Sequence, residues 1–202
     1  MIYLKDVSGF QGDEGTKTDY NILHCAAYDL LRAAMKKEYP DLEGKLIMRH
    51  MPRGKPYFVL SQGETEKKSE VQFNISHSFD KVVCVIGKGE FGIDIEKVRP
   101  WREKVAKRVL HPIEWDYLEK SVNKDLDFIR FWTLKEAYGK YCEKGIGIDF
   151  KNIFFDLGSW SDEKKEIKSN QENLSFLQWK IDSDYILSLC TEKDTYIDES
   201  LF

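Results

Sequence analysis

One long segment near the start of the chain has apolar residues at helical spacing, namely Leu23, Ala26, Ala27, Leu30, Leu31 and Ala34. This spacing predicts a helix over residues 22–39, with Asp19 or Asn21 as its N-cap and Pro40 just after its end. The stretch SQGETEKKSE at 61–70 is mostly charged and polar. We therefore expect an exposed loop there.

Strand-like runs follow in VQFNISHS (71–78), KVVCVIG (81–87) and EFGIDIE (90–96). They are short, rich in β-branched residues and separated by turns, which is typical of neighbouring strands. Farther along, the pattern predicts two short helices divided at His111-Pro112 and a long helix that ends at Gly145. The remainder alternates strand-like segments with charged turns.

Two segments of the chain have a similar pattern. VQFNISHSFDKVVCVIG and LSFLQWKIDSDYILSLC both run strand, polar turn, apolar strand, with a cysteine near the end, and each follows a helix. Hairpins of this kind are common, so the similarity has chance as its alternative. If it is a duplication, it predicts an α+β fold of two similar halves, 1–89 and 90–202, with a cleft between them.

Composition narrows the class of protein. The 202 residues are 42% hydrophobic and 13% aromatic, enough for a packed core, and the net charge is −4. This charge argues against binding nucleic acid through a general basic surface. The four cysteines are scattered, as expected for small core residues of a reduced protein. With no signal peptide or membrane span in the sequence, we expect a cytoplasmic protein without membrane contact.

Two carboxylates of the GIDIE segment are the first candidates for chemistry. Asp94 and Glu96 are two residues apart on a predicted strand, so their side chains point to the same face. Neighbouring carboxylates repel unless a cation lies between them, and hard oxygen ligands suit Mg²⁺. Taken alone, the pair fits a solvated strand end equally well.

The long helix carries a second candidate group. Phe128, Trp132, Glu136 and Lys140 recur every four residues and so follow one slowly turning row, aromatic at one end and ionic at the other. An ordinary amphipathic helix with a Glu-Lys pair is the alternative. Combined, Asp94, Glu96 and Glu136 could bind Mg²⁺ while Lys55, Lys135 and Lys140 neutralise phosphate oxygens, as attack on a diphosphate requires.

Four motifs carry a resemblance to a known family. GKP at 54–56, NISHS at 74–78, FGIDIE at 91–96 and F-x-x-x-W-x-x-K-E-A-x-x-K at 128–140 come in this order. The chain thereby resembles the 4′-phosphopantetheinyl transferases, and most closely their larger, surfactin-synthetase-activating subtype. The resemblance implies a pseudo-twofold pair of α/β halves with the active site in the cleft between them. It also implies transfer of phosphopantetheine from coenzyme A to a serine of an apo acyl or peptidyl carrier protein.

The resemblance assigns roles to individual residues. Metal binding falls to Asp94, Glu96 and Glu136, with Mn²⁺ as a possible substitute for Mg²⁺, and Glu136 is also the expected base. Lys140 is assigned to the pyrophosphate with Lys135 in support, and Glu114, in HPIEW, to orienting a metal-bound water. Contacts to the nucleotide end of coenzyme A are assigned to Lys55, Ser76 and His77. Because adjacent strand residues face opposite ways, Ser76 and His77 are not expected to act as nucleophile and base.

The chain departs from the family at its start. Relatives place basic residues before and within the first helix, whereas here Lys17 and His24 are the candidates, with Arg49 or Arg53 as substitutes. The departure therefore predicts an altered affinity for coenzyme A with the chemistry intact.

A basic segment after the D-x-E strand is the expected carrier-docking surface. It contains Arg99, Trp101, Arg102, Lys107 and Arg108 within ten residues, and carrier proteins are usually acidic. A solvated basic helix is the alternative. We expect a monomer, because two halves in one chain already form the cleft.

Two other functions remain open at this point. One is a non-catalytic module that binds coenzyme A or a carrier. The other is a different Mg²⁺-dependent phosphotransferase, although the P-loop and kinase signatures are missing from the sequence. The sequence does not distinguish fatty acid, polyketide and nonribosomal peptide carriers.

Overall fold

The computed structural model describes residues 1–7, 17–52, 54–62, 65–143, 147–158 and 164–198. The chain divides into two compact units, Met1–Phe91 with Tyr196–Phe202, and Gly92–Thr195. The mixture of helices and antiparallel strands confirms the predicted α+β class. The predicted halves divide at residues 89 and 90, and their pseudo-twofold relation and cleft stay predictions.

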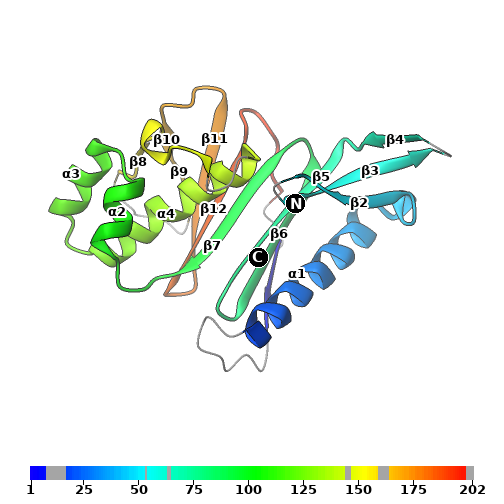
Figure 1. Cartoon of the computed structure of the whole chain (residues 1–202), viewed down its shortest axis with the longest axis horizontal. Helices are drawn as coiled ribbons and strands as arrows, with labels where there is room; N and C mark the ends of the chain where they lie inside the picture. The colour runs from blue at the N-terminus through cyan, green and yellow to red at the C-terminus, as the bar shows by residue number, and fades with distance from the viewer. Residues whose placement is uncertain (8–16, 53, 63–64, 144–146, 159–163, 199–202) are drawn as a thin grey trace. The chain divides into compact units, whose positions relative to one another are not determined.

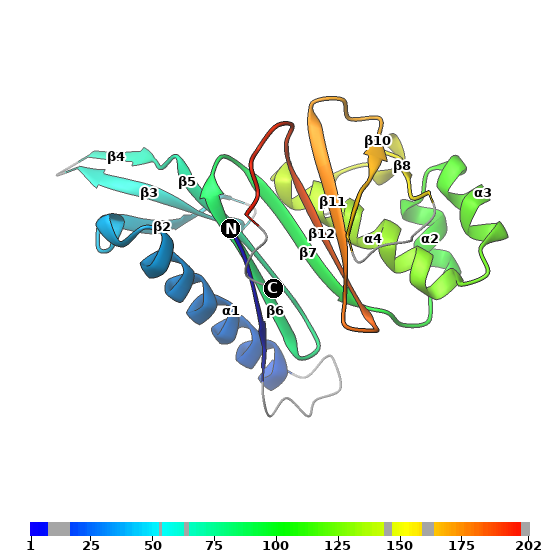
Figure 2. The same ribbon diagram turned by 180° about the vertical axis from the view of Figure 1, so that it is seen from behind.

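The first unit combines one long helix with two three-stranded sheets of order β1-β6-β5 and β2-β3-β4, all paired antiparallel. Its elements are β1 (Ile2–Asp6), α1 (Lys17–Glu38), η1 (Pro40–Leu42), β2 (Leu46–His50), β3 (Pro56–Gln62), β4 (Thr65–Lys68), β5 (Val71–Ser78) and β6 (Lys81–Lys88) (Figure 1). Helix α1 packs on β5 and β6, as both ribbon views show (Figure 2). Leu31 and Ala34 of the helix share a core with Phe73 and Ile86 of the hairpin.

Two predictions about the first unit are wrong. Helix α1 begins at Lys17, so Asp19 and Asn21 lie inside it rather than at its N-cap. The charged segment 61–70 is not a loop throughout, because Thr65–Lys68 forms β4. All four β4 residues are exposed, so this edge strand has no apolar alternation and is held by its pairing with β3. Strands β1 and β2 had no predicted counterpart.

The second unit packs three helices with a four-stranded sheet of order β7-β12-β11-β9 and a small β10-β8 pair. Its elements are β7 (Phe91–Lys97, within this unit from Gly92), α2 (Glu103–Val109), α3 (Pro112–Lys120), α4 (Lys124–Tyr141), η3 (Phe150–Asn152), β8 (Phe155–Asp156), β9 (Lys164–Glu166), β10 (Lys168–Ser169), β11 (Leu174–Ile181) and β12 (Tyr185–Glu192). The predicted division of two short helices at His111-Pro112 is confirmed, since His111 is the N-cap of α3. Gly145, the predicted end of the long helix, lies outside the described residues.

Helix α4 lies against β12 and β11 and organises the core of the second unit. Phe128, Phe131 and Leu134 of the helix pack with Phe176 and Ile186 of the sheet. Each unit therefore contains a long helix on an antiparallel hairpin, β5-β6 in the first and β11-β12 in the second. Within the described ranges, the helices lack the combined length and apolar character needed to cross a bilayer.

Candidate active site

Strand β7 presents the two candidate metal-binding carboxylates on one face. Ile93 and Ile95 are fully buried and alternate with Asp94 and Glu96, so the apolar side chains face one way and the carboxylates the other. Asp94 is 5% exposed as a residue, and the Glu96 side chain is 17% exposed. The predicted same-face geometry of this pair thus follows from the strand.

Gly92 lets β7 approach α4 closely at the start of that same face. A Cβ atom at position 92 would lie 1.9 Å from the carbonyl oxygen of Ala137 and 2.5 Å from the amide nitrogen of Tyr141. These neighbours are helix backbone, so no side chain can move aside. The glycine therefore sets how closely the carboxylate face of β7 lies to the helix that carries Glu136 and Lys140.

Lys140 and Glu136 of α4 lie beside Asp94. The Lys140 ammonium donates to Asp94 Oδ1 at 2.8 Å and to the carbonyl oxygen of Ile93 at 3.0 Å. Burial, followed by the negative charge of Asp94, raises the pKa of Glu136 to about 7, although Lys140 opposes the shift. A carboxyl group with a pKa near neutrality can exchange a proton at physiological pH, which suits a general base.

The oxygen donors of this region fit a hard divalent cation. Asp94, Glu96 and Glu136 offer carboxylates only, the ligand type that Mg²⁺ and Mn²⁺ prefer. Within the described ranges, however, we found no group of three or more His, Cys, Asp and Glu side chains positioned to hold a metal ion. The structure brings Asp94 and Glu136 into electrostatic contact without gathering the three carboxylates into a formed cluster.

Lys135 and Glu114 form a buried ion pair. Both side chains are 0% exposed, and Lys135 Nζ lies 2.6 Å from Glu114 Oε2. The same ammonium donates to the carbonyl oxygens of Phe150 and Ile153 at 2.9 and 2.7 Å. Glu114 accepts from the amides of His111 and Phe155. Burial raises the pKa of Glu114 and lowers that of Lys135, and their mutual attraction opposes both shifts.

These contacts bear on two predicted assignments, and both assignments stay predictions. Lys135 was predicted to support the pyrophosphate, but its three donors point to Glu114 and to two backbone carbonyls inside the core. Glu114 was predicted to orient a metal-bound water, but its oxygens hold the start of α3 and the amide of Phe155. In the structure, the pair joins α3, α4 and the segment around η3.

The predicted nucleotide contacts lie in the first unit. Ser76 is 7% exposed and follows Asn74 on the polar face of β5, whereas Ile75 packs toward α1. His77 is half-buried and, by strand alternation, its side chain lies on the same face as that of Ile75. The Lys55 side chain is 11% exposed, with its ammonium 3.7 Å from Glu90. A role of these three residues in binding coenzyme A stays a prediction.

Of the alternative basic contacts, two are described. Arg49 is exposed and donates to Glu66 Oε2 at 3.0 Å across the β2-β3-β4 sheet. His24 is exposed on α1, its ring 4.7 Å from that of Tyr28. Arg53 and the side chain of Lys17 lie outside the described residues.

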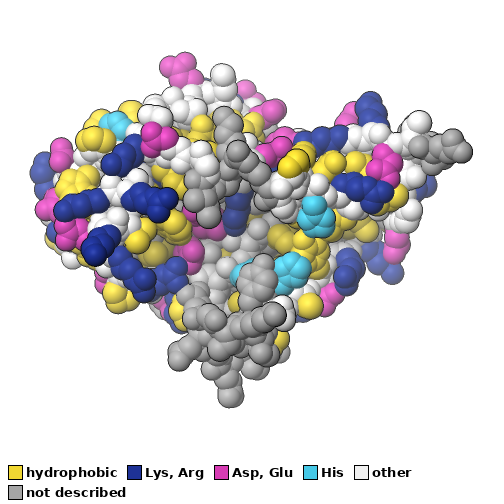
Figure 3. Space-filling model, in the orientation of Figure 1, with side chains coloured by type: hydrophobic (Ala, Val, Ile, Leu, Met, Phe, Trp, Pro, Cys, Tyr) yellow, Lys and Arg dark blue, Asp and Glu magenta, His cyan; other side chains and the backbone are white. Residues whose placement is uncertain are grey.

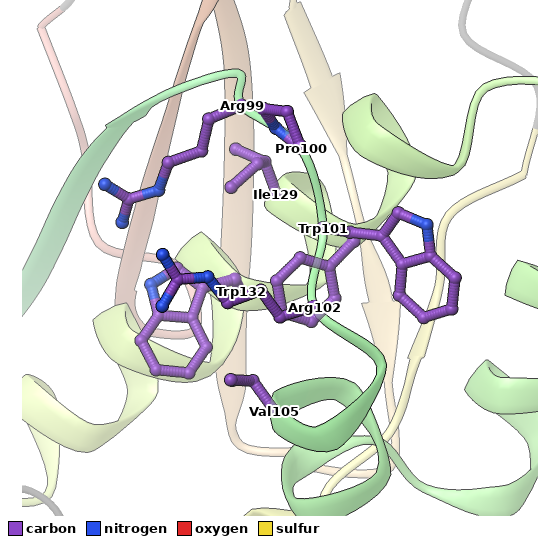
Figure 4. Close-up of a pocket in the computed structure, with 8 residues that line it drawn as sticks. Arg99, Pro100, Trp101, Arg102, Val105, Ile129 and Trp132 are labelled. Atoms are coloured by element: carbon purple, nitrogen blue, oxygen red, sulfur yellow. The ribbon is translucent and has the colours of Figure 1, made fainter.

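The basic segment after β7 borders a cavity of about 580 Å³ (Figure 4). Its lining is mostly apolar and comes from α4 and the 99–105 segment: Arg99, Pro100, Trp101, Arg102, Val105, Phe128, Ile129 and Trp132. Trp101 is tied down through its amide, which donates to Asp125 at 3.0 Å. Lys107 and Arg108 are exposed on α2, and Figure 3 shows Lys and Arg side chains, with acidic ones among them, over this part of the unit.

Sequence reasoning missed a polar network under α4. Arg130 is 2% exposed and donates to Gln178 at 3.0 Å, to Asp127 and to the carbonyl of Leu157 at 3.2 Å. Gln178 in turn donates to Ser188 at 2.9 Å, and Ser188 shares a hydrogen bond with Thr133. The available signal was the arginine within FIRFW, because a cation among aromatic residues requires partners.

Comparison with protein families gives a match over half of the chain. The 4′-phosphopantetheinyl transferase superfamily matches residues 90–190, a range that includes β7, α4 and the carboxylates described above. A solved structure of holo-[acyl-carrier-protein] synthase from Thermotoga maritima is 20% identical, with a TM-score of 0.41, and covers 55% of this chain and 70% of that one.

Curated relatives extend the match. A 4′-phosphopantetheinyl transferase of Bacillus subtilis is 28% identical over 171 residues, covering 84% of this chain and 73% of the relative. The transferase gsp of Aneurinibacillus migulanus is 32% identical over 60% of this chain and 56% of its own length. The transferase HetI of Nostoc is 35% identical over 51% of this chain and 44% of its own length. Beyond the first relative, the matches thus span about half of each protein.

Proposed function

Because the chain belongs to the 4′-phosphopantetheinyl transferase superfamily, in its surfactin-synthetase-activating subtype, we propose that it modifies an apo acyl or peptidyl carrier protein. It takes the 4′-phosphopantetheine group from coenzyme A and transfers it to a serine hydroxyl of the carrier. The observation that carries this proposal is the contact of β7 with α4, which sets Asp94, Glu136 and Lys140 beside one another.

The reaction breaks the phosphoanhydride bond of the coenzyme A diphosphate and forms a phosphoester bond to the carrier serine. The carrier serine oxygen attacks the phosphorus that bears the pantetheine arm, and the bond from that phosphorus to the bridging oxygen breaks. The leaving group is adenosine 3′,5′-bisphosphate. The serine proton goes to Glu136, directly or through water, because this carboxylate lies beside Asp94 and Lys140.

Asp94, Glu96 and Glu136 would hold Mg²⁺, or Mn²⁺ in its place. A divalent cation at this position supplies positive charge that stabilises the diphosphate as its bridging bond breaks. Lys140 holds Asp94 through its ammonium at 2.8 Å, so we assign it to the leaving phosphate as well.

In the first unit, we assign Lys55, Ser76 and His77 to the 3′-phosphate and nucleotide of coenzyme A. A hydroxyl and an imidazole are phosphate donors, and His77 donates best when protonated. Exchange of Lys55 for Met should raise the KM for coenzyme A with little change in kcat. An unchanged KM in a titration of coenzyme A would show that Lys55 does not contribute to binding coenzyme A.

The carrier docks, we propose, on Arg99, Trp101, Arg102, Lys107 and Arg108. The support is local charge and an apolar cavity in a chain of net charge −4. From the family resemblance we also propose a cytoplasmic monomer that serves fatty acid, polyketide or nonribosomal peptide carriers. Light scattering of the purified chain tests the monomer, and a mass corresponding to two chains would contradict it.

The decisive experiment is intact-protein mass spectrometry of an apo carrier incubated with the chain, coenzyme A and Mg²⁺. We expect the carrier to gain one phosphopantetheine group. The gain should be lost with EDTA and in Glu136→Ala, and retained in Glu172→Gln, which changes an exposed carboxylate of the same unit.

Two outcomes would indicate a function other than phosphopantetheine transfer. Binding of coenzyme A without any mass gain on several unrelated carriers would indicate a non-catalytic binding module. Transfer of a phosphate-sized group to another acceptor would indicate a different Mg²⁺-dependent phosphotransferase.

A further inference from the structure

Glu96 is held at both carboxylate oxygens by residues that line the cavity. Trp132 Nε1 donates to Oε1 at 3.3 Å, and an Arg99 guanidinium nitrogen lies 3.5 Å from Oε2. Both Trp132 and Arg99 belong to the cavity lining. A group that enters this cavity therefore meets the two residues that fix a proposed metal ligand.

The two contacts differ in how easily they can be exchanged. Trp132 packs in the core of the second unit and stacks on Phe128 with ring centroids 6.3 Å apart, so its indole N–H is a fixed neutral donor. The Arg99 side chain is 43% exposed, and an ion pair this accessible contributes only about 0.2–1 kcal/mol. The arginine can leave Glu96 for another carboxylate at little cost.

The charge of Arg99 would also oppose a cation bound by Glu96. A guanidinium beside Oε2 and a divalent metal ion on that oxygen repel each other, and both draw on the same negative charge. Lys140 stands in a similar relation to Asp94, but its side chain is less exposed, at 28%. Of these two cations, Arg99 is therefore the more readily displaced.

We propose that Arg99 is a positioning residue that exchanges Glu96 for an acidic group of the docked carrier and so makes Glu96 available to the metal. In the absence of carrier, Arg99 holds Oε2 and weakens cation binding. When an acidic carrier residue reaches the rim of the cavity, the arginine fork pairs with it, while Trp132 keeps Oε1 oriented. The inference rests on the proposed function, because it takes Glu96 as a metal ligand and an acidic carrier as the partner.

Arg102 supplies a matched control. It lines the same cavity, and in Figure 4 its guanidinium extends to the same side of the cavity as that of Arg99. It is exposed, and within the described part of the chain it forms no ion pair. Arg99→Gln and Arg102→Gln remove the same charge from the same rim, and the first also removes the contact with Glu96.

The test is a titration of the full-length chain with Mn²⁺, with unbound Mn²⁺ followed by electron paramagnetic resonance and coenzyme A left out. We expect Arg99→Gln to bind Mn²⁺ about 2- to 5-fold more tightly than the wild type, the range that an exposed ion pair allows. Arg102→Gln should stay closer to the wild type, and Asp94→Asn should bind most weakly. A saturating apo carrier should tighten Mn²⁺ binding by a similar factor in the wild type but not in Arg99→Gln.

Reciprocity provides a second readout. If the carrier tightens Mn²⁺ binding, Mn²⁺ must tighten carrier binding by the same factor, which calorimetry with the carrier can measure. This factor should vanish in Arg99→Gln and persist in Arg102→Gln.

Three results would overturn the inference: equal or weaker Mn²⁺ binding in Arg99→Gln, an equal effect of both arginine variants, or no Mn²⁺ binding by any variant. These results are separable from the proposed function. A carrier that gains phosphopantetheine while the arginine variants bind Mn²⁺ alike leaves the function intact and removes the inference. Tighter Mn²⁺ binding in Arg99→Gln with no transfer to any carrier leaves the competition at Glu96 intact and removes the function.

Discussion

Two lysines on the same helix, five residues apart, have different surroundings. The Lys135 side chain is 0% exposed and is occupied by Glu114 and two backbone carbonyls. The Lys140 side chain is 28% exposed and reaches Asp94. A charge enclosed in the core affects the stability of the fold. An ammonium that is partly exposed beside the carboxylates can contact a phosphate.

Lys135→Met should therefore mainly lower stability, whereas Lys140→Met should mainly lower transfer activity. Removing one member of a buried ion pair leaves the other charge unpaired and costs about 3–5 kcal/mol, so Lys135→Met should lower the free energy of unfolding by this amount. Lys140→Met should cost only about 2 kcal/mol, the range for a hydrogen bond to a charged group. Urea denaturation measures both.

Transfer assays complete that comparison. At low temperature the folded fraction of Lys135→Met should retain turnover, while Lys140→Met should lose nearly all of it. Normal stability in Lys135→Met would contradict the structural role given to the buried pair.

Glu136 should make stability depend on pH. Its folded-state pKa is raised from 4.5 to about 7, so between these values the folded protein holds a proton that the unfolded chain releases. Stability is then lost as pH rises from 4.5 to 7, by up to about 3 kcal/mol at 1.36 kcal/mol per pKa unit. Glu136→Gln removes this pH-dependent contribution to the free energy of unfolding. The variant should therefore be more stable than the wild type at pH 8, but not at pH 4.5.

Denaturant unfolding of both proteins in EDTA at pH 4.5, 6 and 8 measures this difference. Glu172→Gln, an exposed substitution, should keep the wild-type pH profile. Parallel profiles for the wild type and Glu136→Gln would show that Glu136 titrates with its ordinary pKa.

At the scale of elements, the contact of β7 with α4 depends on Gly92. Gly92→Ala would place a methyl group 1.9 Å from the carbonyl oxygen of Ala137, so the strand and the helix must separate. We expect a loss of about 3 kcal/mol or more and a fall in transfer activity that exceeds the loss of folded protein, since Asp94 moves away from Lys140.

Gly87→Ala is the matched control, because its Cβ would meet only the side chain of Phe91, at 3.1 Å. A ring edge can shift by a few tenths of an ångström, so this variant should be nearly as stable as the wild type. Thermal unfolding measures both, and equal melting temperatures for the two variants would contradict a close approach at Gly92.

The same elements show what could be predicted from the sequence. Alternation along FGIDIE predicted that Asp94 and Glu96 share a face, and four-residue spacing predicted the row that leads to Lys140; the strand and the helix bear out both patterns. Two other features depend on contacts between separate segments and could not be predicted from the local pattern. Strand β4 is charged and exposed but pairs with β3, and the burial of Lys135 depends on Glu114, twenty-one residues away in the sequence.

The family could be predicted because its motifs are local. GKP, NISHS, FGIDIE and the W-x-x-K-E-A-x-x-K helix are short stretches, and the family match over residues 90–190 confirms the resemblance. Individual roles were harder to predict, because a motif records residue types and not exposure. Lys135 lies within the motif but points into the core.

At the scale of the whole molecule, charge is unevenly distributed. The net charge is −4, yet α2 exposes Lys104, Lys107 and Arg108. If this surface receives an acidic carrier, Arg108→Gln should raise the KM for the carrier about 2- to 5-fold and reduce its dependence on salt, with kcat unchanged.

Steady-state kinetics between about 50 and 300 mM NaCl, where screening lengths change most, test this expectation. Lys180→Gln on β11 removes the same charge from another exposed position of the second unit and should leave the KM unchanged. An equal effect of both substitutions would mean that total charge, and not a surface on α2, governs association.

The polar network under α4 has a consequence for engineering. Apolar burial is non-directional, so an aliphatic interface alone does not fix the position of a helix along a sheet. Here Arg130, Thr133, Gln178 and Ser188 are joined by directional hydrogen bonds in the observed alignment of α4. Shifting the helix by one turn would leave these buried polar atoms without hydrogen-bond partners. We therefore expect variants selected for new specificity to carry substitutions in the loops and on the rim of the cavity, with the position of α4 on the sheet unchanged.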